Sequence, residues 1–428
     1  MTADINTERR ARRGGGVWSG SRIVVALVGA ALVAASCASS NDGAPVFGVA
    51  APSIGSEEVA PEELPTPTTA APQPSAAELA LADMTVEEKV GQLLMPVLAG
   101  TSATSVTAAE AAANGDVAGG LATPAEIVAR YNLGGVLYLG LNIDTADQLG
   151  TLSEGLQRAA EADSSVGLLI AVDQEGGRVS QITDGVTVFP PAATLSGDVE
   201  AVAEAGYLTG QQVQLQGVNV VLAPVADLNP PNSAGAIGNR SYGEDPAVVA
   251  QMVEAAIDGL QGAGVAAAVK HWPGHGATRV DSHLDLPSLD VTQATWDARE
   301  RVPFASAIDA EVSIVLVGHL VLPGIDPSAD PATFSSVLID DLLRNQLDFN
   351  GVVMTDALNM GALDAYDQGA VVVDAILAGA DIMLFPPDLD VAYTALLAAV
   401  NNGRIAQERL DQSVLRVLAL KESLGLLD

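Results

Sequence analysis

The sequence predicts an α/β protein whose fold class is a TIM-like (β/α)8 barrel in a single domain. Short apolar runs rich in Val, Ile and Leu recur along the chain, and each is followed by polar, Gly-rich residues and then a helical stretch. Continuous apolar strands separated by helices indicate a parallel sheet buried on both faces. Seven or eight such units in about 350 residues favour a barrel, although an open doubly wound sheet has the same periodicity. The runs span residues 135–139, 167–172, 218–222, 265–269, 313–317, 351–354 and 380–384.

The first 37 residues resemble a bacterial export signal. Five arginines precede the apolar run 23–35, which is too short to span a bilayer as an ordinary transmembrane helix. The run ends in Ala34-Ala35-Ser36-Cys37, which is similar to the lipobox of bacterial lipoproteins except that Ala34 replaces the usual leucine. We expect a signal peptide over residues 1–37, lipidation of Cys37 and a location on the outer face of the cytoplasmic membrane. A secreted protein or an uncleaved anchor is the alternative.

Residues 38–75 are rich in Pro, Ala, Ser, Thr and Glu and show no sustained period, which predicts a disordered linker. The barrel domain is expected over residues 76–428. Residues 85–88 have the form of a capping box and predict a helix. An apolar stripe at helical spacing follows, made by Val90, Leu93, Leu94 and Val97. Residues 101–120 are Ala-rich and predict a loop or a short helix.

Charge and cysteine content exclude several classes of partner and site. The formal net charge is −34 at pH 7, which argues against binding to nucleic acid and against a polybasic contact with anionic lipid. The single cysteine rules out an intrachain disulfide and a thiolate metal cluster.

Chemically capable side chains follow four of the apolar runs. Residues 173–178 (Asp-Gln-Glu-Gly-Gly-Arg) follow Val172, and Lys270-His271 follow Val269. Gly318-His319 and Thr355-Asp356 follow the runs ending at Val317 and Met354. Barrel enzymes have their active sites at the carboxyl ends of the strands, so we expect the site there.

Residues 270–287 contain three of the four histidines, namely His271, His275 and His283. Pro273 and two glycines preclude a helix, so this segment is a loop that leaves a strand. One interpretation is a metal site of three histidines and an aspartate, but no His-Glu-x-x-His motif supports it. A second is a Ser282 nucleophile beside His283, but the Gly-x-Ser-x-Gly elbow is absent.

The third interpretation is an acid/base pair of Asp281 and His283. The two residues are two positions apart, so the carboxylate can hold one ring nitrogen and leave the other free to transfer a proton. This interpretation needs a separate nucleophile, and Asp356, at the end of another strand, is the natural candidate.

Residues 270–287 resemble the Lys-His-Phe-Pro-Gly-His-Gly…Asp-Ser-His…Leu-Pro signature of glycoside hydrolase family 3, in its β-N-acetylhexosaminidase branch, with Trp272 in place of Phe. The resemblance extends from about residue 76 to the C-terminus. Further matching segments are residues 87–92, 172–179, 240–246, 318–319 with 323–326, and 351–360. In the β-glucosidase branch the acid comes from a second domain, for which we expect no room before Asp428.

The resemblance implies a retaining double displacement with Asp356 as nucleophile and the His283–Asp281 pair as acid/base. It implies no cofactor and no metal. The residues that it implies for sugar binding are Asp173, Arg240, Lys270 and His271. Arg178 and His319 are expected behind them or in the wall of the site, with a structural ion pair as the alternative for Arg178.

The expected function is removal of terminal, non-reducing β-N-acetylglucosamine from a carbohydrate partner, either peptidoglycan fragments or chitooligosaccharides. The alternatives are a non-catalytic cell-wall saccharide-binding lipoprotein on the same scaffold, and another β-glycosidase or a phosphorylase of the family.

Overall fold

The structure, a computed structural model, describes residues 74–162, 166–231 and 236–427. The predicted signal peptide, Cys37 and residues 38–73 of the predicted linker lie outside the described residues. Within the described residues, no helix is both long and apolar enough to cross a membrane.

The strands are β1 (Leu94–Met95), β2 (Gly135–Tyr138), β3 (Leu169–Val172), β4 (Gln174–Gly176), β5 (Val179–Ser180), β6 (Val220–Val221), β7 (Ala266–Trp272), β8 (Ile314–Val317), β9 (Val352–Thr355) and β10 (Met383–Leu384). The α-helices are α1 (Ala76–Asp83), α2 (Val86–Gly91), α3 (Ala108–Val117), α4 (Pro124–Tyr131), α5 (Ala146–Ala160), α6 (Ala192–Leu195), α7 (Val199–Gln214), α8 (Pro246–Gly262), α9 (Gln293–Ala298), α10 (Arg301–Asp309), α11 (Gln368–Ala378), α12 (Leu389–Asn401) and α13 (Gln407–Ser423). Short 3-10 helices span Gly140–Asn142, Gly238–Arg240, Ala332–Phe334 and Gly361–Leu363, and a π-helix spans Val337–Gln346.

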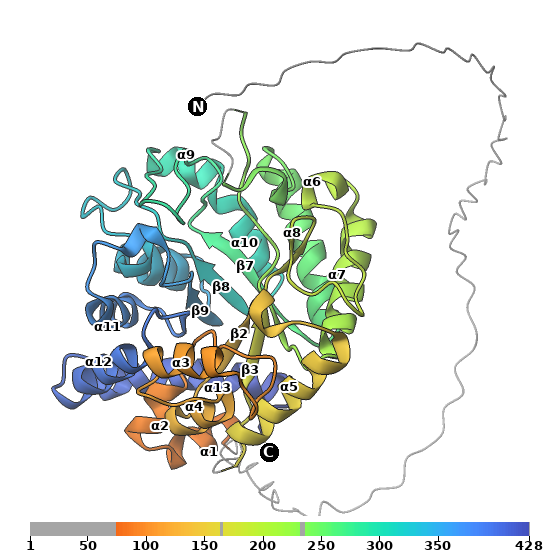
Figure 1. The fold of residues 1–428 in the computed structure, drawn as a ribbon. Coiled ribbons are helices and arrows are strands. Elements are labelled where there is room, and N and C mark those ends of the chain that lie inside the picture. Colours follow the sequence, from red (N-terminus) through yellow and green to blue (C-terminus); the bar gives the residue numbers. More distant parts are fainter. Residues whose placement is uncertain (1–73, 163–165, 232–235, 428) are drawn as a thin grey trace, which may run out of the picture. The chain divides into compact units, whose positions relative to one another are not determined.

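In the described residues, six strands form one parallel sheet in the order β2-β3-β6-β7-β8-β9, and β1 pairs in parallel with β10. Both edges of the sheet are connected to this pair. Beside β2 the Leu137 N–H donates to the Pro96 carbonyl oxygen at 2.9 Å, and beside β9 Met354 forms a parallel bridge with Ile382. The helices surround the strands (Figure 1). The arrangement is TIM-like, and each of the seven predicted runs contains or overlaps a strand.

The predicted first helix is shorter in the structure. Thr85 caps α2 as expected, because its hydroxyl accepts from the Glu88 N–H while the Glu88 carboxylate accepts from the Thr85 N–H. The prediction that the helical stripe continues beyond Gly91 is wrong, because Leu94 and Met95 form strand β1. Both residues are fully buried and pair with β10, so their apolar character reflects a strand covered on both faces.

Alternate residues of the strands lie in two separate apolar clusters. One cluster fills the interior of the barrel and the other lies between the strands and the helices. The interior set includes Leu169 and Ala171 of β3, Ala266 and Ala268 of β7, and Val352 and Met354 of β9. This alternation with a period of two determines which side chains point inward where each strand ends.

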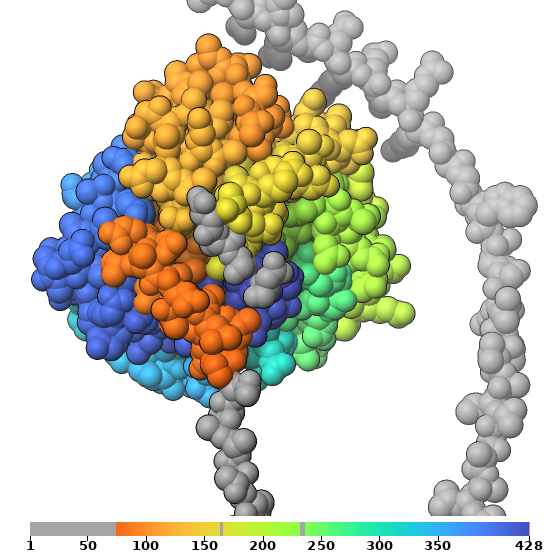
Figure 2. Space-filling view, turned by 90° about the horizontal axis from the view of Figure 1, so that it is seen from below, coloured from red at the N-terminus to blue at the C-terminus, as the bar shows by residue number. Residues whose placement is uncertain are grey.

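Helix α13 lies at the amino ends of the strands. Its Val417 and Leu420 pack into the interior cluster, and the Leu426 carbonyl oxygen accepts from the Gly167 N–H just before β3. Helix α1 packs on α13, where the Glu422 carboxylate accepts from the Ala76 N–H at 3.1 Å. Figure 2 shows the segment that begins at residue 74 (orange) beside the C-terminal segment (blue). The first and last described helices therefore meet at this end of the barrel.

Candidate active site

Three of the predicted site residues continue the inward-facing series of their strands. Asp173 follows β3, Lys270 lies near the end of β7 and Asp356 follows β9. Each stands two positions beyond an inward-facing strand residue, so the alternation directs its side chain into the mouth of the barrel. The contacts agree, because Lys270 Nζ lies 2.5 Å from Asp173 Oδ1.

Lys270 and Arg240 share a buried carboxylate, that of Glu175. Lys270 Nζ lies 2.6 Å from Glu175 Oε1. Arg240 donates from Nε and Nη2 to the two oxygens of Glu175, both at 2.7 Å. The side chains of Glu175 and Lys270 are each only 4% exposed. Burial alone would raise the pKa of Glu175, but the two cations outweigh it and lower the pKa to about 2. The carboxylate is therefore ionised and holds both cations in place.

His271 is oriented by a second buried carboxylate, that of Asp227. His271 Nδ1 lies 2.6 Å from Asp227 Oδ2, and Asp227 is fully buried. Burial would raise the pKa of Asp227, but His271 and His275 outweigh it and hold the pKa below its usual value. An ionised Asp227 accepts a hydrogen bond from His271 Nδ1–H, and Nε2 then faces Arg240 Nη2 at 3.4 Å.

Asp356 lies in a positive environment that keeps its carboxylate ionised. Burial would raise its pKa, but His271, His319, the Ala357 N–H and Lys270 together lower it. The Ala357 N–H donates to Asp356 Oδ1 at 2.8 Å. His319 is fully buried, with Nδ1 2.6 Å from Thr333 Oγ1 and Nε2 3.1 Å from the Ala357 carbonyl oxygen. His319 thus contacts the residue that follows Asp356.

Asp281 and His283 form the predicted pair. His283 Nδ1 lies 2.8 Å from Asp281 Oδ1, and the His283 N–H donates to the same oxygen at 3.0 Å. The side chains of Asp281 and His283 are 41% and 69% exposed. Burial would raise the pKa of Asp281, but the backbone N–H and ring of His283 together outweigh it and lower the pKa. Within the described residues, the Asp281 contact involves the ring nitrogen Nδ1 of His283 and not Nε2.

Arg178 has a backbone partner rather than a member of the ion network in the described residues. Its side chain is exposed, and Nη2 donates to the Ala236 carbonyl oxygen at 2.9 Å. In the described part of the chain it forms no ion pair, so it connects the β4–β5 hairpin to the segment before Arg240 through a carbonyl. Trp272, which replaces the usual Phe, packs outward edge-on against Trp296 and Phe304.

Sequence reasoning missed three residues of the site: Glu175, Asp227 and His275. Glu175 is in the segment after β3 but was not assigned a role, because the sequence does not show which cations it meets. Asp227 does not follow β6 directly, because the mostly apolar residues 222–226 lie between them. Asp227 therefore does not stand out as a polar residue at a strand end. His275 contacts Ser282 Oγ at 2.9 Å, so the Ser282 hydroxyl meets His275 rather than His283.

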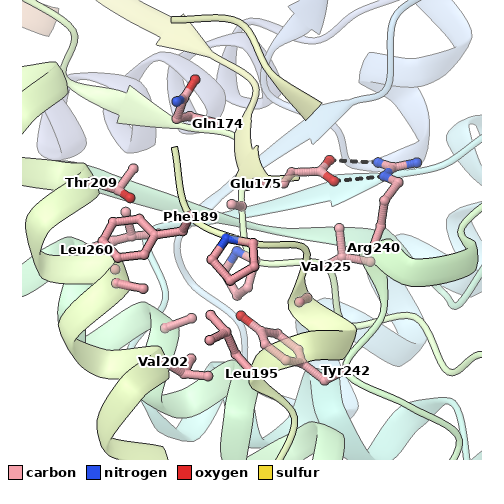
Figure 3. Close-up of a pocket in the computed structure, with 18 of the residues that line it drawn as sticks. Gln174, Glu175, Phe189, Leu195, Val202, Thr209, Val225, Arg240, Tyr242 and Leu260 are labelled. Atoms are coloured by element: carbon pink, nitrogen blue, oxygen red, sulfur yellow. Dashed lines mark hydrogen bonds and ion pairs between the residues drawn. The ribbon is translucent and has the colours of Figure 1, made fainter. Parts of the chain in front are cut away.

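A small cavity lies behind the Glu175–Arg240 pair. Figure 3 shows this pair at one side of the cavity and apolar side chains such as Phe189, Leu195 and Leu260 at the other. Its volume is about 50 Å³. A cavity of roughly 150 Å³ is needed to hold a benzene ring, so this space does not accept a sugar. The cavity lies between the Glu175–Arg240 pair and side chains of helices α7 and α8.

Comparison with known proteins gives a consistent result. A family model described as the Glycosyl hydrolase family 3 N terminal domain matches residues 85–420. Two curated relatives are each 34% identical to this chain: Beta-hexosaminidase A of Pseudoalteromonas piscicida, over 70% of this chain and 55% of the relative, and Beta-hexosaminidase of Nitrosomonas eutropha, over 68% and 86%.

A solved structure, that of a glycoside hydrolase family 3 beta-N-acetylglucosaminidase from Paenibacillus sp. str. FPU-7, is similar in fold. It superposes with a TM-score of 0.73 and 39% identity over 80% of this chain and 63% of that chain. This chain thus spans less than two thirds of the Pseudoalteromonas and Paenibacillus proteins, but most of the Nitrosomonas protein.

Proposed function

Because this chain belongs to glycosyl hydrolase family 3, we propose that it is a retaining exo-β-N-acetylglucosaminidase. The proposed substrates have a terminal, non-reducing β-linked N-acetylglucosamine, as in peptidoglycan fragments or chitooligosaccharides. The names of the hexosaminidase relatives support this sugar preference. We further propose that residues 76–428 form a single catalytic barrel domain.

One observation carries the proposal: an ionised aspartate and a carboxylate–histidine pair occur together, on separate strand-end segments. In the first step an oxygen of Asp356 attacks the anomeric carbon, and the bond from that carbon to the aglycone oxygen breaks. Protonated His283 gives its Nε2 proton to the departing oxygen and becomes neutral, while Asp281 stabilises the cation beforehand. The products are an alcohol and a glycosyl ester on Asp356.

In the second step His283 acts as a base. Its neutral Nε2 takes a proton from water while the water oxygen attacks the anomeric carbon, and the ester bond to Asp356 breaks. The sugar leaves with its β configuration, Asp356 is again a carboxylate and His283 is again protonated. Two displacements at one carbon account for retention.

The ion network supplies the binding side of the reaction in this proposal. Asp173 and the cations Lys270 and Arg240 offer acceptors and donors to the sugar hydroxyls and the N-acetyl group, and His271 offers Nε2. Because Glu175 and Asp227 hold these groups in place before substrate arrives, little reorganisation is needed on binding.

The test is turnover of 4-nitrophenyl β-N-acetylglucosaminide by wild type and by Asp356→Ala. We expect the variant to lose activity by at least about 10³-fold, since no other group replaces the nucleophile. Asp364→Ala, which removes an exposed carboxylate from the same segment, is the matched control and should retain activity. Near-wild-type turnover by Asp356→Ala would refute the nucleophile. Saccharide binding without turnover by wild type would instead favour the non-catalytic alternative.

Substrate choice needs a panel of muropeptides, chitobiose and aryl glycosides, assayed with and without phosphate. We expect the highest kcat/KM on a muropeptide or chitobiose and no acceleration by phosphate. Formation of a sugar 1-phosphate would reassign the protein as a phosphorylase.

We also propose that Cys37 is lipidated and that the protein is exported to the outer face of the cytoplasmic membrane. The basic and apolar signal and the residues 34–37 support this proposal. Mass spectrometry of Cys37, or accumulation of the precursor in globomycin, tests it. An unmodified Cys37 in the mature protein would favour secretion.

A further inference from the structure

We propose that His275 is a positioning residue that fixes the loop containing Asp281 and His283, through Thr278 and Ser282, without contacting substrate. The inference rests on the proposed function, in which that loop gives and takes the proton.

His275 has both ring nitrogens engaged by hydroxyls of this loop. Nδ1 lies 2.7 Å from Thr278 Oγ1, and Nε2 lies 2.9 Å from Ser282 Oγ. His275 and Ser282 are each only 3% exposed, whereas His283 next to Ser282 is exposed. The loop is therefore pinned at the residue between the two members of the acid/base pair.

A second connection fixes the same point from the side of the nucleophile. The Ser282 carbonyl oxygen accepts from the Ala362 N–H at 3.0 Å, and the His283 carbonyl oxygen accepts from the Gly361 N–H at 3.3 Å. A Cβ at Gly361 would lie 2.7 Å from the His283 carbonyl oxygen, so only glycine allows this approach. Ser282 thus joins His275 through its side chain and the segment after Asp356 through its backbone.

His275 is in turn fixed by the carboxylate that orients the sugar-binding histidine. The His275 N–H donates to Asp227 Oδ1 at 2.6 Å, and the other oxygen of Asp227 holds His271. The two histidine rings lie edge-on with their centroids 6.0 Å apart. One buried carboxylate therefore sets the position of a binding group and of the loop anchor together.

The protonation of His275 suits this role. Burial lowers its pKa, which outweighs the attraction of Asp227, so the ring stays neutral. The titratable groups that act on it are Asp227, His271 and Asp356. A neutral imidazole has one donor and one acceptor, and a hydroxyl serves as either, so both contacts are satisfied without a charge beside the site.

The test compares two aryl β-N-acetylglucosaminides, one with a poor leaving group (phenol) and one with a good one (2,4-dinitrophenol). If the loop is displaced, His283 protonates the poor leaving group less well. The good leaving group departs without protonation, so its release should change little. We expect Ser282→Ala to lower kcat/KM for the phenyl substrate about 10-fold or more and for the dinitrophenyl substrate less than about 3-fold. Thr278→Val, which removes the other hydroxyl at constant shape, should show the same split. Ser282→Thr, which keeps the hydroxyl, should restore most of the activity.

The matched control is Ser288→Ala, which removes an exposed serine hydroxyl bonded to Asp290 further along the chain. It should leave both substrates unaffected. Thermal unfolding of each variant shows whether it folds. If Ser282→Ala does not fold, the comparison is made with Thr278→Val.

An equal loss on both substrates, or behaviour like that of Ser288→Ala, would overturn the positioning role. A wild-type protein that turns over neither substrate would overturn the proposed function, which is a different result.

Discussion

The ion network around Glu175 and the Asp281–His283 pair both join a carboxylate to a cationic or ionisable partner, yet they have opposite environments. The network side chains Glu175 and Lys270 are 4% exposed, whereas Asp281 and His283 are 41% and 69% exposed. Glu175 has two cationic partners, and Asp281 has one imidazole that is two residues away.

The difference follows from what each group must do in the proposed reaction. Groups that bind the sugar act by fixed charge, which is strongest where water is excluded and no reorganisation is required. A group that moves a proton must reach the leaving oxygen and then a water molecule, so it needs access. The same kind of pair is therefore buried in one region and exposed in the other, and the two should respond differently to mutation.

The largest expected effect comes from breaking the network. Glu175→Gln leaves Lys270 and Arg240 buried with too little negative charge, so we expect the free energy of unfolding to fall by about 3–5 kcal/mol, together with activity. Urea unfolding monitored by circular dichroism measures the first and aryl glycoside turnover the second. An unchanged free energy of unfolding would mean that water or another carboxylate compensates for Glu175. The buried network would then not differ from the exposed pair in its contribution to stability.

Breaking the exposed pair should affect activity alone. His283→Ala should lower kcat/KM by about 10²–10⁴-fold with poor leaving groups and much less with good ones. The free energy of unfolding should change by no more than about 0.5 kcal/mol, because the side chain is exposed. Asp281→Asn should show the same pattern more weakly. A uniform loss across leaving groups would indicate a binding role for His283.

Lowering the pH should remove the contribution of the buried network to the free energy of unfolding. The folded-state pKa of Glu175 is about 2, below its ordinary value near 4.5, so its stabilisation is complete above about pH 4.5 and is lost as the pH falls towards 2. The difference in unfolding free energy between wild type and Glu175→Gln should therefore narrow over this range, by at most about 1.4 kcal/mol per pH unit. Urea unfolding between pH 6 and pH 3 measures it. If the difference in unfolding free energy stays constant over this pH range, Glu175 does not have the lowered pKa.

The smallest effect is expected at a surface pair that has no part in the site. Arg404 and Asp374 are paired with side chains 50% and 43% exposed. Arg404→Ala should change the free energy of unfolding by less than about 1 kcal/mol and leave turnover unchanged. This variant measures how much an exposed ion pair contributes to the free energy of unfolding. A larger effect would show that exposure alone does not explain the difference between the two regions.

The sequence was sufficient for the features that depend on local pattern. Seven apolar runs predicted strands, and alternation along them directs Asp173, Lys270 and Asp356 inward, as the contacts show. The Asp281–His283 contact was predictable because both partners are on one short loop. Strand β1 was not predictable from the sequence, because Leu94 and Met95 also fit a helical stripe and their partner strand is almost 300 residues away.

The buried carboxylates could not be predicted because their roles depend on long-range contacts. Glu175 meets Lys270 and Arg240, which come from two other segments of the barrel, and nothing local distinguishes it from a surface glutamate. Asp227 is similar, because its partner His271 is 44 positions further along the chain. A sequence pattern indicates which strand end holds a residue, but charge pairing between strand ends appears only in three dimensions.

The meeting of α1 with α13 has a consequence for access. The chain enters the described fold at residue 74, at the end of the barrel opposite to Asp356. If Cys37 is held in a membrane, the 74 − 37 = 37 residues between them can reach at most about 130 Å. Such an anchor would connect to the amino ends of the strands, whereas Asp356 follows the carboxyl end of β9. Attachment at the opposite pole would have made anchor and substrate compete for the same opening.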